Sequence, residues 1–355
     1  MKISFIISSL SNTGGTERMT CLMANELDLH GYDVSIISLT GSANSAFELN
    51  RKVSCLSLFP NVQNIRQTIG FGKIVKSLRN EVVKQKSECV IIVDIGLSVF
   101  TIPALIGKNI RMIGWEHFNY NSNLHKKWRK YLKRISLFFL DDVVTLTQSD
   151  KKVYLSKKFR KSKITCIPNP IIVNPVRAKA KLDNKIAISI GRLTYQKGFD
   201  ILIDIWSEIE SKDDNWQLWI VGDGELYHQL RLNIEEKGLT RVKLLGERQD
   251  IEKLLYSSSL YLMTSRFEGL PMVLLEAVAV GVPIVSFDCE TGPSEIVKDN
   301  GYLIPMGNRQ QFINKTLEIM NDDAERLKLG ANSSGVLDNF DKDEIVMSWI
   351  SLLNK

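Results

Sequence analysis

Short apolar runs alternate with amphipathic stretches along almost the whole chain. In the first half, runs rich in Val and Ile predict strands near residues 3–8, 34–39, 90–94, 110–114, 143–146 and 164–167. In the second half, similar runs predict strands near residues 186–191, 218–221, 242–245, 260–264, 283–287 and 302–304. Segments with helical periodicity separate most of them. Such alternation is typical of parallel sheets with helices on both faces, so we predict an α/β fold.

The alternation begins again after a proline-rich and polar segment near the middle of the chain. A chain of 355 residues exceeds what one core usually supports, so two domains are expected. We predict a Rossmann-like domain over 1–170, a linker over 171–184 and a second Rossmann-like domain over 185–340. The last helix, 341–355, is expected to pack back on the first domain. Ligands of such sheets bind at the carboxyl ends of the strands, so we expect a cleft there.

The composition indicates the cellular compartment and the kind of partner that we expect. The five scattered cysteines have no zinc-like spacing, and their odd number favours a reducing compartment. Residues 1–10 contain a single basic residue, and residues 89–107 are interrupted by Asp94, Gly96 and Pro103, so we expect neither a signal peptide nor a transmembrane span. Residues 1–174 hold 25 Lys and Arg against 12 Asp and Glu, whereas the remainder holds 21 against 28. An acidic partner is therefore expected on the first half.

Two glutamates flank a turn at the start of a predicted helix. Glu268 precedes the turn Gly269-Leu270-Pro271, and Glu276 lies inside the helix. A proline suits the first helical position, so the backbone N–H groups of Met272 and Val273 are left pointing forward. Such a helix start attracts anions.

The spacing of these two carboxylates suggests what each of them binds. Glu276 lies one turn beyond Met272, where a bound phosphate would repel it, so we expect it to accept hydrogen bonds from neutral hydroxyls such as those of a ribose. Glu268 would face a sugar with several hydroxyls. The pattern predicts a nucleotide-sugar site.

Two cations follow the first strand of the second half. Arg192 and Lys197 lie on a loop that opens a helix, where together they could neutralise a diphosphate. Taken singly, each is an ordinary surface cation, and their place after a strand favours the functional interpretation. Gly14 and Gly15 form a strand-to-helix turn that allows close approach of a ligand, although a simple tight turn explains them equally well.

Three further positions carry weaker signals. His117 follows a predicted strand, where a packing role and a role facing the cleft are both open. Arg248 follows another strand and could contact a base. The triplet Asp341-Lys342-Asp343 matches a metal-binding pattern, but its place before a helix favours an N-cap, so we predict no bound metal and no cofactor.

Residues 124–139 combine cations with an apolar stripe at helical spacing. The stripe contains Trp128, Leu132, Ile135 and Phe139, and a similar basic run follows at 151–163. The pattern predicts a helix lying on an anionic bilayer, with an ordinary solvated helix face as the alternative. No stacking platform accompanies the charge, so we expect no nucleic acid partner. The predicted membrane-facing or acceptor-facing residues are Lys126, Lys127, Trp128, Arg129, Lys130, Lys133 and Arg134.

Together these motifs resemble those of retaining glycosyltransferases with the GT-B fold and the Glu-x7-Glu signature, family GT4. The resemblance spans nearly the whole chain and rests on the order of the motifs, from the Gly14-Gly15 turn to residues 265–276. It implies two facing Rossmann-like domains with an intervening cleft and metal-independent transfer. It also implies Arg192 and Lys197 on the diphosphate, Glu276 on the ribose and Glu268 on the transferred sugar, with Gly15 and His117 approaching from the first domain.

The same resemblance suggests the substrates. Residues 289–296 resemble a Thr-Gly-Pro stretch of bacterial enzymes that use UDP-hexoses or UDP-N-acetylhexosamines. We expect a cytoplasmic, peripheral membrane enzyme that transfers such a sugar to a lipid-linked, lipopolysaccharide or capsular glycan acceptor. A sugar-nucleotide epimerase of similar two-domain fold and a non-catalytic nucleotide-sugar-binding protein are the alternatives.

Overall fold

The chain forms two compact units. The computed structural model describes residues 1–62, 69–121, 127–172 and 179–355, and only the backbone of 127–130. One unit comprises Met1–Asn169 with Asp343–Lys355, and the other comprises Pro170–Lys342. The predicted boundary after residue 170 differs from this division by one residue. Residues 173–178 of the predicted linker lie outside the described residues.

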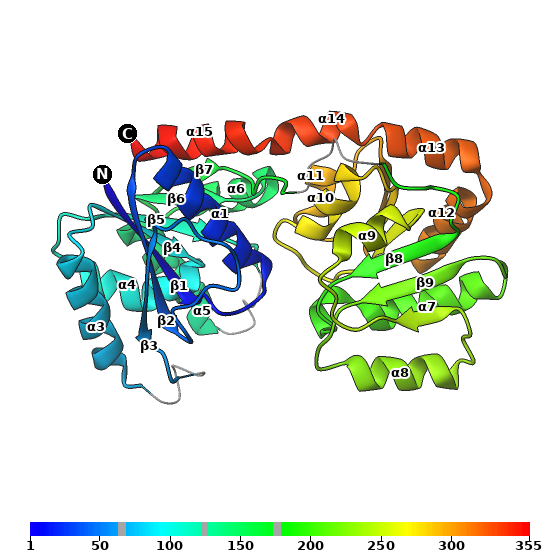
Figure 1. Cartoon of the computed structure of the whole chain (residues 1–355), viewed down its shortest axis with the longest axis horizontal. Coiled ribbons are helices and arrows are strands. Elements are labelled where there is room, and N and C mark those ends of the chain that lie inside the picture. Colours follow the sequence, from blue (N-terminus) through cyan, green and yellow to red (C-terminus); the bar gives the residue numbers. More distant parts are fainter. Residues whose placement is uncertain (63–68, 122–126, 173–178) are drawn as a thin grey trace. The chain divides into compact units, whose positions relative to one another are not determined.

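The first unit is built on a seven-stranded parallel sheet in the order β3-β2-β1-β4-β5-β6-β7 (Figure 1). Its strands are β1 Lys2–Ser9, β2 Asp33–Thr40, β3 Ser54–Phe59, β4 Cys89–Val93, β5 Arg111–Glu116, β6 Asp142–Thr145 and β7 Lys163–Cys166. The sequence did not predict β3. This strand pairs with β2 at the edge of the sheet and is mostly half-buried, so it lacks the continuous apolar run of a central strand.

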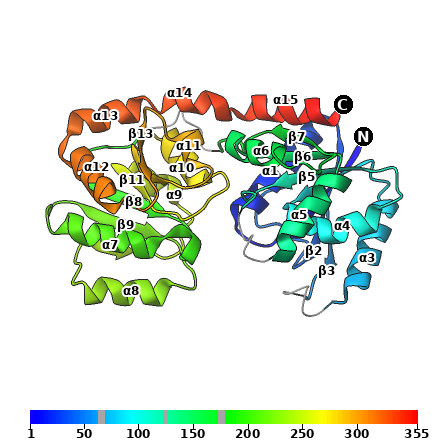
Figure 2. The same ribbon diagram turned by 180° about the vertical axis from the view of Figure 1, so that it is seen from behind.

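Helices cover both faces of this sheet. Helix α1 lies on one face, and α3, α4 and α5 lie on the other, as the two opposite views show (Figures 1 and 2). Helix α15 packs its Trp349 ring 5.1 Å from the Trp115 ring of β5. The helices of this unit are α1 Gly15–Leu29, α3 Phe71–Lys84, the 3-10 turn η1 Ile95–Leu97, α4 Ser98–Leu105, α5 Lys127–Phe139, α6 Gln148–Leu155 and α15 Lys342–Leu353.

The second unit repeats the plan with a six-stranded parallel sheet in the order β10-β9-β8-β11-β12-β13. Its strands are β8 Ile186–Ile190, β9 Gln217–Val221, β10 Val242–Leu244, β11 Leu260–Met263, β12 Ile284–Asp288 and β13 Gly301–Pro305. Its helices are η2 Tyr195–Lys197, α7 Phe199–Glu210, α8 Tyr227–Glu236, α9 Ile251–Tyr256, α10 Met272–Ala279, α11 Pro293–Ile296, α12 Arg309–Asn321, α13 Asp323–Ala331, α14 Ser334–Leu337 and η3 Asp338–Phe340.

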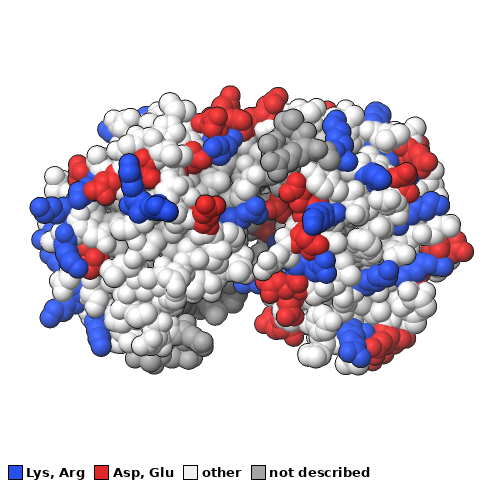
Figure 3. Space-filling view, viewed as in Figure 1, with Lys and Arg blue, Asp and Glu red and all other residues white. Residues whose placement is uncertain are grey.

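These two parallel sheets confirm the predicted α/β class with two Rossmann-like domains. In the second domain, the core packs α7 and α12 against the sheet, with Phe199, Trp206, Phe287 and Phe312 fully buried. None of the helices in the described ranges is both long enough and apolar enough to span a bilayer. On the face drawn in Figure 3, basic and acidic side chains are interspersed over the second domain.

Candidate active site

The order of strands in the second domain reverses at β8, which lies between β9 and β11. Loops that leave adjacent strands at such a switch point run in opposite directions and open a crevice, which is where doubly wound sheets bind ligands. The loop after β8 carries Arg192 and Lys197, and the segment after β11 carries Glu268. The topology therefore brings the motif that contains Arg192 and Lys197 next to the motif that contains Glu268.

Lys197 and Glu268 form an ion pair across this switch point. The Lys197 Nζ lies 2.7 Å from the Glu268 Oε1, and the side chains are 20% and 6% exposed. Gly191 lies beneath the lysine stem, since a Cβ at that position would lie 3.2 Å from the Lys197 Cδ and Cε. The sequence assigned the two charges to different parts of a ligand, and the structure shows that they are also each other's partners.

Several contacts hold the two loops in fixed register. Gly198 has φ +67°, and a Cβ there would lie 2.2 Å from the Thr264 carbonyl oxygen, so the position requires glycine. The Thr264 hydroxyl donates to the Gly198 carbonyl at 2.9 Å. Arg266 donates to both oxygens of Asp200, at 2.9 and 2.6 Å, and lies 4.1 Å from the Tyr195 ring centroid. Arg266 lowers the pKa of the Asp200 carboxyl through these bonds.

A third loop supports Glu268 from its backbone side. The Thr291 hydroxyl donates to the Glu268 carbonyl oxygen at 2.6 Å. The next residue, Gly292, has φ +98°, and a Cβ there would lie 2.5 Å from the Gly269 carbonyl oxygen. Thr291 was not among the predicted site residues, although the Thr-Gly-Pro stretch was the signal that could have identified it.

Helix α10 begins one residue later than predicted. Pro271 is its N-cap, with φ −75° and ψ 96°, rather than its first helical residue. Met272 and Val273 still form the first turn, and Glu276 is half-buried within the helix. Leu270, in the preceding turn, is buried at 7% exposure.

Tyr261 links the strands beneath the two carboxylates. Its hydroxyl group lies 3.1 Å from the Ile190 backbone nitrogen and 3.2 Å from the Ile190 carbonyl oxygen, which joins β11 to β8. Burial raises the pKa of Tyr261, and the charges of Glu268 and Glu276 raise it further. Both carboxylates therefore act electrostatically on the same buried hydroxyl.

The two predicted arginines of this domain differ in their surroundings. Arg192 is exposed on the loop after β8. Arg248 is also exposed, and it binds Asp250 with two hydrogen bonds of 2.8 Å each. Asp250 is the N-cap residue of α9, but its side chain makes no cap hydrogen bond and binds Arg248 instead.

In the first domain, the glycine turn follows β1 at the point where the strand order reverses between β1 and β4. Gly14 is the N-cap of α1 and Gly15 is its first residue. A Cβ at Gly14 would lie 2.6 Å from the Glu17 Oε2, so a larger residue there would displace that side chain. The turn lies where a ligand of a doubly wound sheet is expected.

His117 lies directly after β5 and is 9% exposed. Its ring centroid is 4.4 Å from that of Trp115, and its Nε2 has no hydrogen-bond partner among the described residues. Burial lowers the pKa of His117 to about 3, so the imidazole is neutral at physiological pH. A buried ring nitrogen without a partner is able to hydrogen-bond a ligand.

The structure corrects one residue of the predicted membrane helix. Lys133 is 8% exposed and its ammonium lies 3.1 Å from the Glu116 Oε2, inside the first domain. It cannot face a membrane, because a buried ammonium retains the partners that satisfy it. Arg134, by contrast, is exposed. Lys126 lies outside the described residues, as do the side chains of Lys127, Trp128, Arg129 and Lys130.

The residues of the predicted apolar stripe of that helix differ in their burial. Leu132 is buried against the core, whereas Ile135 and Phe139 are 49% and 40% exposed. Phe138, outside the predicted stripe, is 44% exposed. Helix α5 therefore buries one part of its apolar surface and exposes another.

In the described part of the chain, no three His, Cys, Asp or Glu side chains are grouped so that they could hold a metal ion.

Two family models match consecutive parts of the chain. The model described as Glycosyltransferase Family 4 matches residues 13–174, and the model described as Glycosyl transferases group 1 matches residues 174–335. The junction between the two matches lies close to the division between the two structural units.

Relatives align along nearly the whole length. An uncharacterised glycosyltransferase of Haemophilus influenzae is 32% identical over 359 residues, covering 99% of both chains. A Campylobacter jejuni GalNAc-alpha-(1->4)-GalNAc-alpha-(1->3)-diNAcBac-PP-undecaprenol alpha-1,4-N-acetyl-D-galactosaminyltransferase is 27% identical, covering 99% of this chain and 98% of its own. Among solved structures, S. aureus TarM in complex with fondaparinux, alpha-GlcNAc-glycerol and UDP superposes with a TM-score of 0.85 at 17% identity, covering 100% of both chains. This superposition confirms the GT-B fold.

Proposed function

The chain belongs to glycosyltransferase family 4, and from that premise we propose that it transfers a hexose or N-acetylhexosamine from a UDP-sugar to a lipid-linked, lipopolysaccharide or capsular glycan, with retention of configuration. The observation that carries the proposal is the Lys197–Glu268 pair at the switch point of the second sheet. In this proposal, Lys197 is the cation for the diphosphate and the neighbouring Glu268 is the acceptor for sugar hydroxyls.

The charges of this site suit a departing nucleoside diphosphate. A lysine ammonium has three donors, and among the described residues Lys197 bonds only Glu268, which leaves donors for phosphate oxygens. Arg192 is exposed on the same loop and supplies a second cation. Both cations would stabilise the negative charge that develops on the diphosphate as its bond to the sugar breaks. Glu276 would bind the ribose, and Gly14 and Gly15 would approach the phosphates.

The remaining roles follow from the same chemistry. Glu268 would hydrogen-bond the transferred sugar, and His117 would contact the same sugar as a neutral group. The acceptor would attack from the face that the diphosphate leaves, and the leaving phosphate would take the acceptor proton. In this scheme no enzyme carboxylate acts as nucleophile, and no metal is needed for charge stabilisation.

The substrates are proposed from relatives. The solved TarM complex contains UDP, which supports a uridine diphosphate donor. The Campylobacter jejuni relative carries an undecaprenol diphosphate glycan in its name, which supports a lipid-linked acceptor. An acceptor anchored in the inner face of the cell membrane would require the enzyme to work at that surface from the cytoplasm.

An aromatic and basic surface of the first domain supports membrane binding. It consists of Phe138 and Phe139 of α5 with Phe159, which is 82% exposed, and the exposed cations Lys158 and Arg160. The adjacent Lys161 joins the two segments, because its backbone nitrogen donates to the Leu137 carbonyl at 2.8 Å and its ammonium lies 4.0 Å from the Phe138 ring centroid. Aromatic rings beside cations suit the interface of an anionic bilayer. Figure 2 shows α5 on the side turned away in Figure 1.

The activity is tested by donor screening followed by turnover. UDP-hexoses and UDP-N-acetylhexosamines are first screened by thermal shift, since a ligand of the folded state raises the unfolding temperature. Release of UDP is then measured with and without a lipid-linked glycan. Transfer that disappears in Glu268→Ala supports the proposal. A changed sugar-nucleotide without acceptor would identify an epimerase, and binding without any turnover would identify a non-catalytic protein.

Membrane binding is tested with liposomes containing phosphatidylglycerol. The variant Phe138→Ser/Phe159→Ser/Arg160→Glu should lose most of its binding. The control Lys73→Glu/Lys76→Glu changes exposed cations of α3 and should bind like the unmodified chain. Equal binding by both variants would contradict this surface.

A further inference from the structure

The ammonium of Lys133 lies inside the first domain, at 8% exposure. Burial of an unpaired ammonium is strongly unfavourable, so such a group persists only where partners satisfy it. Each of its three donors has an acceptor. The Glu116 Oε2 lies 3.1 Å away, the Asn119 carbonyl oxygen 3.0 Å and the Tyr120 carbonyl oxygen 2.9 Å.

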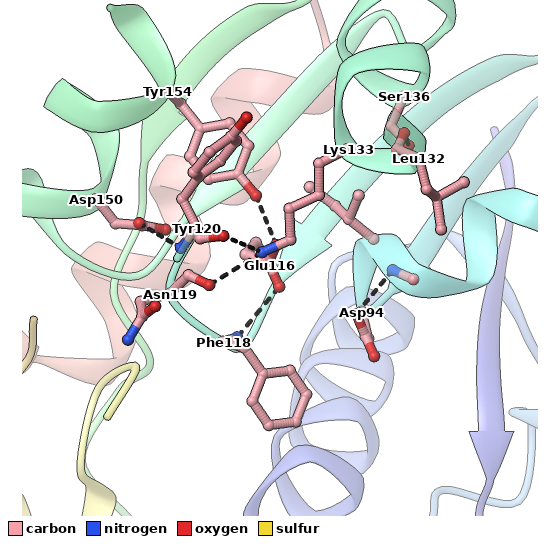
Figure 4. A network of polar contacts seen from close by, with 12 residues as sticks. Asp94, Glu116, Phe118, Asn119, Tyr120, Leu132, Lys133, Ser136, Asp150 and Tyr154 are labelled. Atoms are coloured by element: carbon pink, nitrogen blue, oxygen red, sulfur yellow. Dashed lines mark hydrogen bonds and ion pairs between the residues drawn. The ribbon is translucent and has the colours of Figure 1, made fainter. Parts of the chain in front are cut away.

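All three acceptors belong to one short segment, residues 116–120, directly after β5. Lys133 comes from helix α5, so a single side chain holds the whole turn from a neighbouring element (Figure 4). A lysine that served the fold alone could use any buried carbonyl. Here the contacts are concentrated on the segment that carries His117.

Other groups fix the same segment. The Tyr154 hydroxyl donates to the Glu116 Oε2 at 2.5 Å, and the Phe118 N–H donates to the Glu116 Oε1 at 3.2 Å. The Tyr120 N–H donates to the Asp150 Oδ1 at 2.8 Å. Burial and the Glu116 charge raise the pKa of Tyr154, so its hydroxyl keeps the donated proton. The segment is thus anchored on both sides of His117.

We propose that Lys133 is a positioning residue of the transfer reaction, whose ammonium fixes segment 116–120 so that the His117 imidazole meets the transferred sugar. The inference rests on the proposed function, which places His117 at that sugar. His117 lies between Glu116 and Phe118, which are bonded to each other, and its Nε2 has no partner among the described residues. A ring whose nitrogen must meet a ligand gains from a backbone that cannot rotate away.

The test that does not depend on a donor is NMR of the histidine rings in the full chain. The chain has four histidines, and the signal missing in His117→Gln assigns His117. In the unmodified chain this signal should not titrate between about pH 5 and 8, because the folded pKa is about 3. In Lys133→Met the released segment should let the ring reach water, so its pKa should move toward the ordinary value near 6.5. A signal that stays flat in a folded Lys133→Met overturns the proposal.

Kinetics supply the second readout. Binding of UDP, measured by calorimetry, should stay within about twofold in Lys133→Met, because segment 116–120 supplies none of the proposed UDP contacts. The turnover number for UDP release should fall by about 10- to 100-fold, as displacement of a reacting group predicts. Lys84→Met is the matched control, since it removes an exposed lysine that pairs with Glu81 on α3. Unchanged turnover in a folded Lys133→Met also overturns the proposal.

Two further variants keep the outcomes distinct. If Lys133→Met does not fold, Glu116→Gln/Lys133→Met removes both buried charges and is measured in its place. If His117→Gln leaves turnover unchanged, the proposed role of His117 fails. The NMR measurement still decides whether Lys133 positions the ring, so the two failures are separable.

Discussion

Two lysine–glutamate pairs of this chain have similar chemistry and different surroundings. In the first domain, Lys133 and Glu116 have side chains 9% and 0% exposed, and the chain itself satisfies every donor of the ammonium. In the second domain, Lys197 is 20% exposed and bonds only Glu268 among the described residues. A saturated pair fixes a backbone, whereas a pair with unused donors can exchange partners with a ligand. The local environment, rather than the residue types, therefore distinguishes the proposed positioning role of Lys133 from the proposed binding role of Lys197.

The largest expected effect is on stability. Lys133→Met should destabilise the first domain by about 3–5 kcal/mol, because it leaves a buried carboxylate without its cation. Lys197→Met should cost less, since water reaches that pair. Urea unfolding followed by tryptophan fluorescence measures both. We call the Lys133–Glu116 pair saturated and the Lys197–Glu268 pair, which has unused donors, open. Equal losses of unfolding free energy in the two variants would contradict this distinction.

For activity we expect the reverse order, with the larger loss in the Lys197 variant. Lys197→Met should lower transfer by about 10²- to 10³-fold, the usual effect of removing a group that stabilises developing charge. Lys237→Met is the matched control, because it breaks an exposed ion pair with Asp204 in the same domain. UDP release under saturating donor gives the rates. Similar rates for Lys197→Met and the control would contradict the binding role of the open pair.

The buried segment held by Lys133 should also make stability depend on pH. The His117 pKa is about 3 in the folded chain and ordinarily 6.5, so below about pH 6.5 only the unfolded chain takes up this proton. Stability therefore falls as the pH drops from 6.5 toward 3, by about 1.4 kcal/mol per pH unit from this group. Between pH 6.5 and 5 the loss is about 2 kcal/mol. His117→Gln should lack this loss of stability, and urea midpoints of the variant and the unmodified chain at pH 6.5 and 5 measure the difference. If both chains lost the same stability between these pH values, the His117 ring would be accessible to water.

The smallest expected effect concerns the backbone support of Glu268. Thr291→Val keeps the shape of the side chain and removes the hydroxyl that donates to the Glu268 carbonyl. A lost hydrogen bond of this kind costs about 1 kcal/mol, so transfer should fall by about fivefold while UDP binding changes little. Ser at this position should retain activity. If the Val variant were as active as the Ser variant, the hydrogen bond from residue 291 to the Glu268 carbonyl would not contribute to transfer.

Much of the fold followed from local patterns. Apolar runs predicted twelve of the strands, because central parallel strands are buried on both faces and stand out as continuous hydrophobic segments. Strand β3 did not stand out, because an edge position leaves it half-buried. The motif around Glu268 was recognisable because strand, turn and helix follow one another within a few residues.

Side-chain partners across distant segments were not predictable. Lys133 lies among cations in the sequence, and helical periodicity alone placed it with a solvated or membrane-facing surface. Only folding brings Glu116 and the carbonyls of Asn119 and Tyr120 to its ammonium. The same holds for Thr291 beneath Glu268, since the two residues come from different loops.

The sequence by itself determined the parallel α/β architecture and the order of the motifs, because hydrophobic periodicity and turn chemistry act over a few residues. The tertiary structure decided which charges are open and which are saturated. That difference depends on burial and on partners up to 71 residues apart, as in Lys197 and Glu268. Strand order at β8 sets this proximity, and no local pattern contains it.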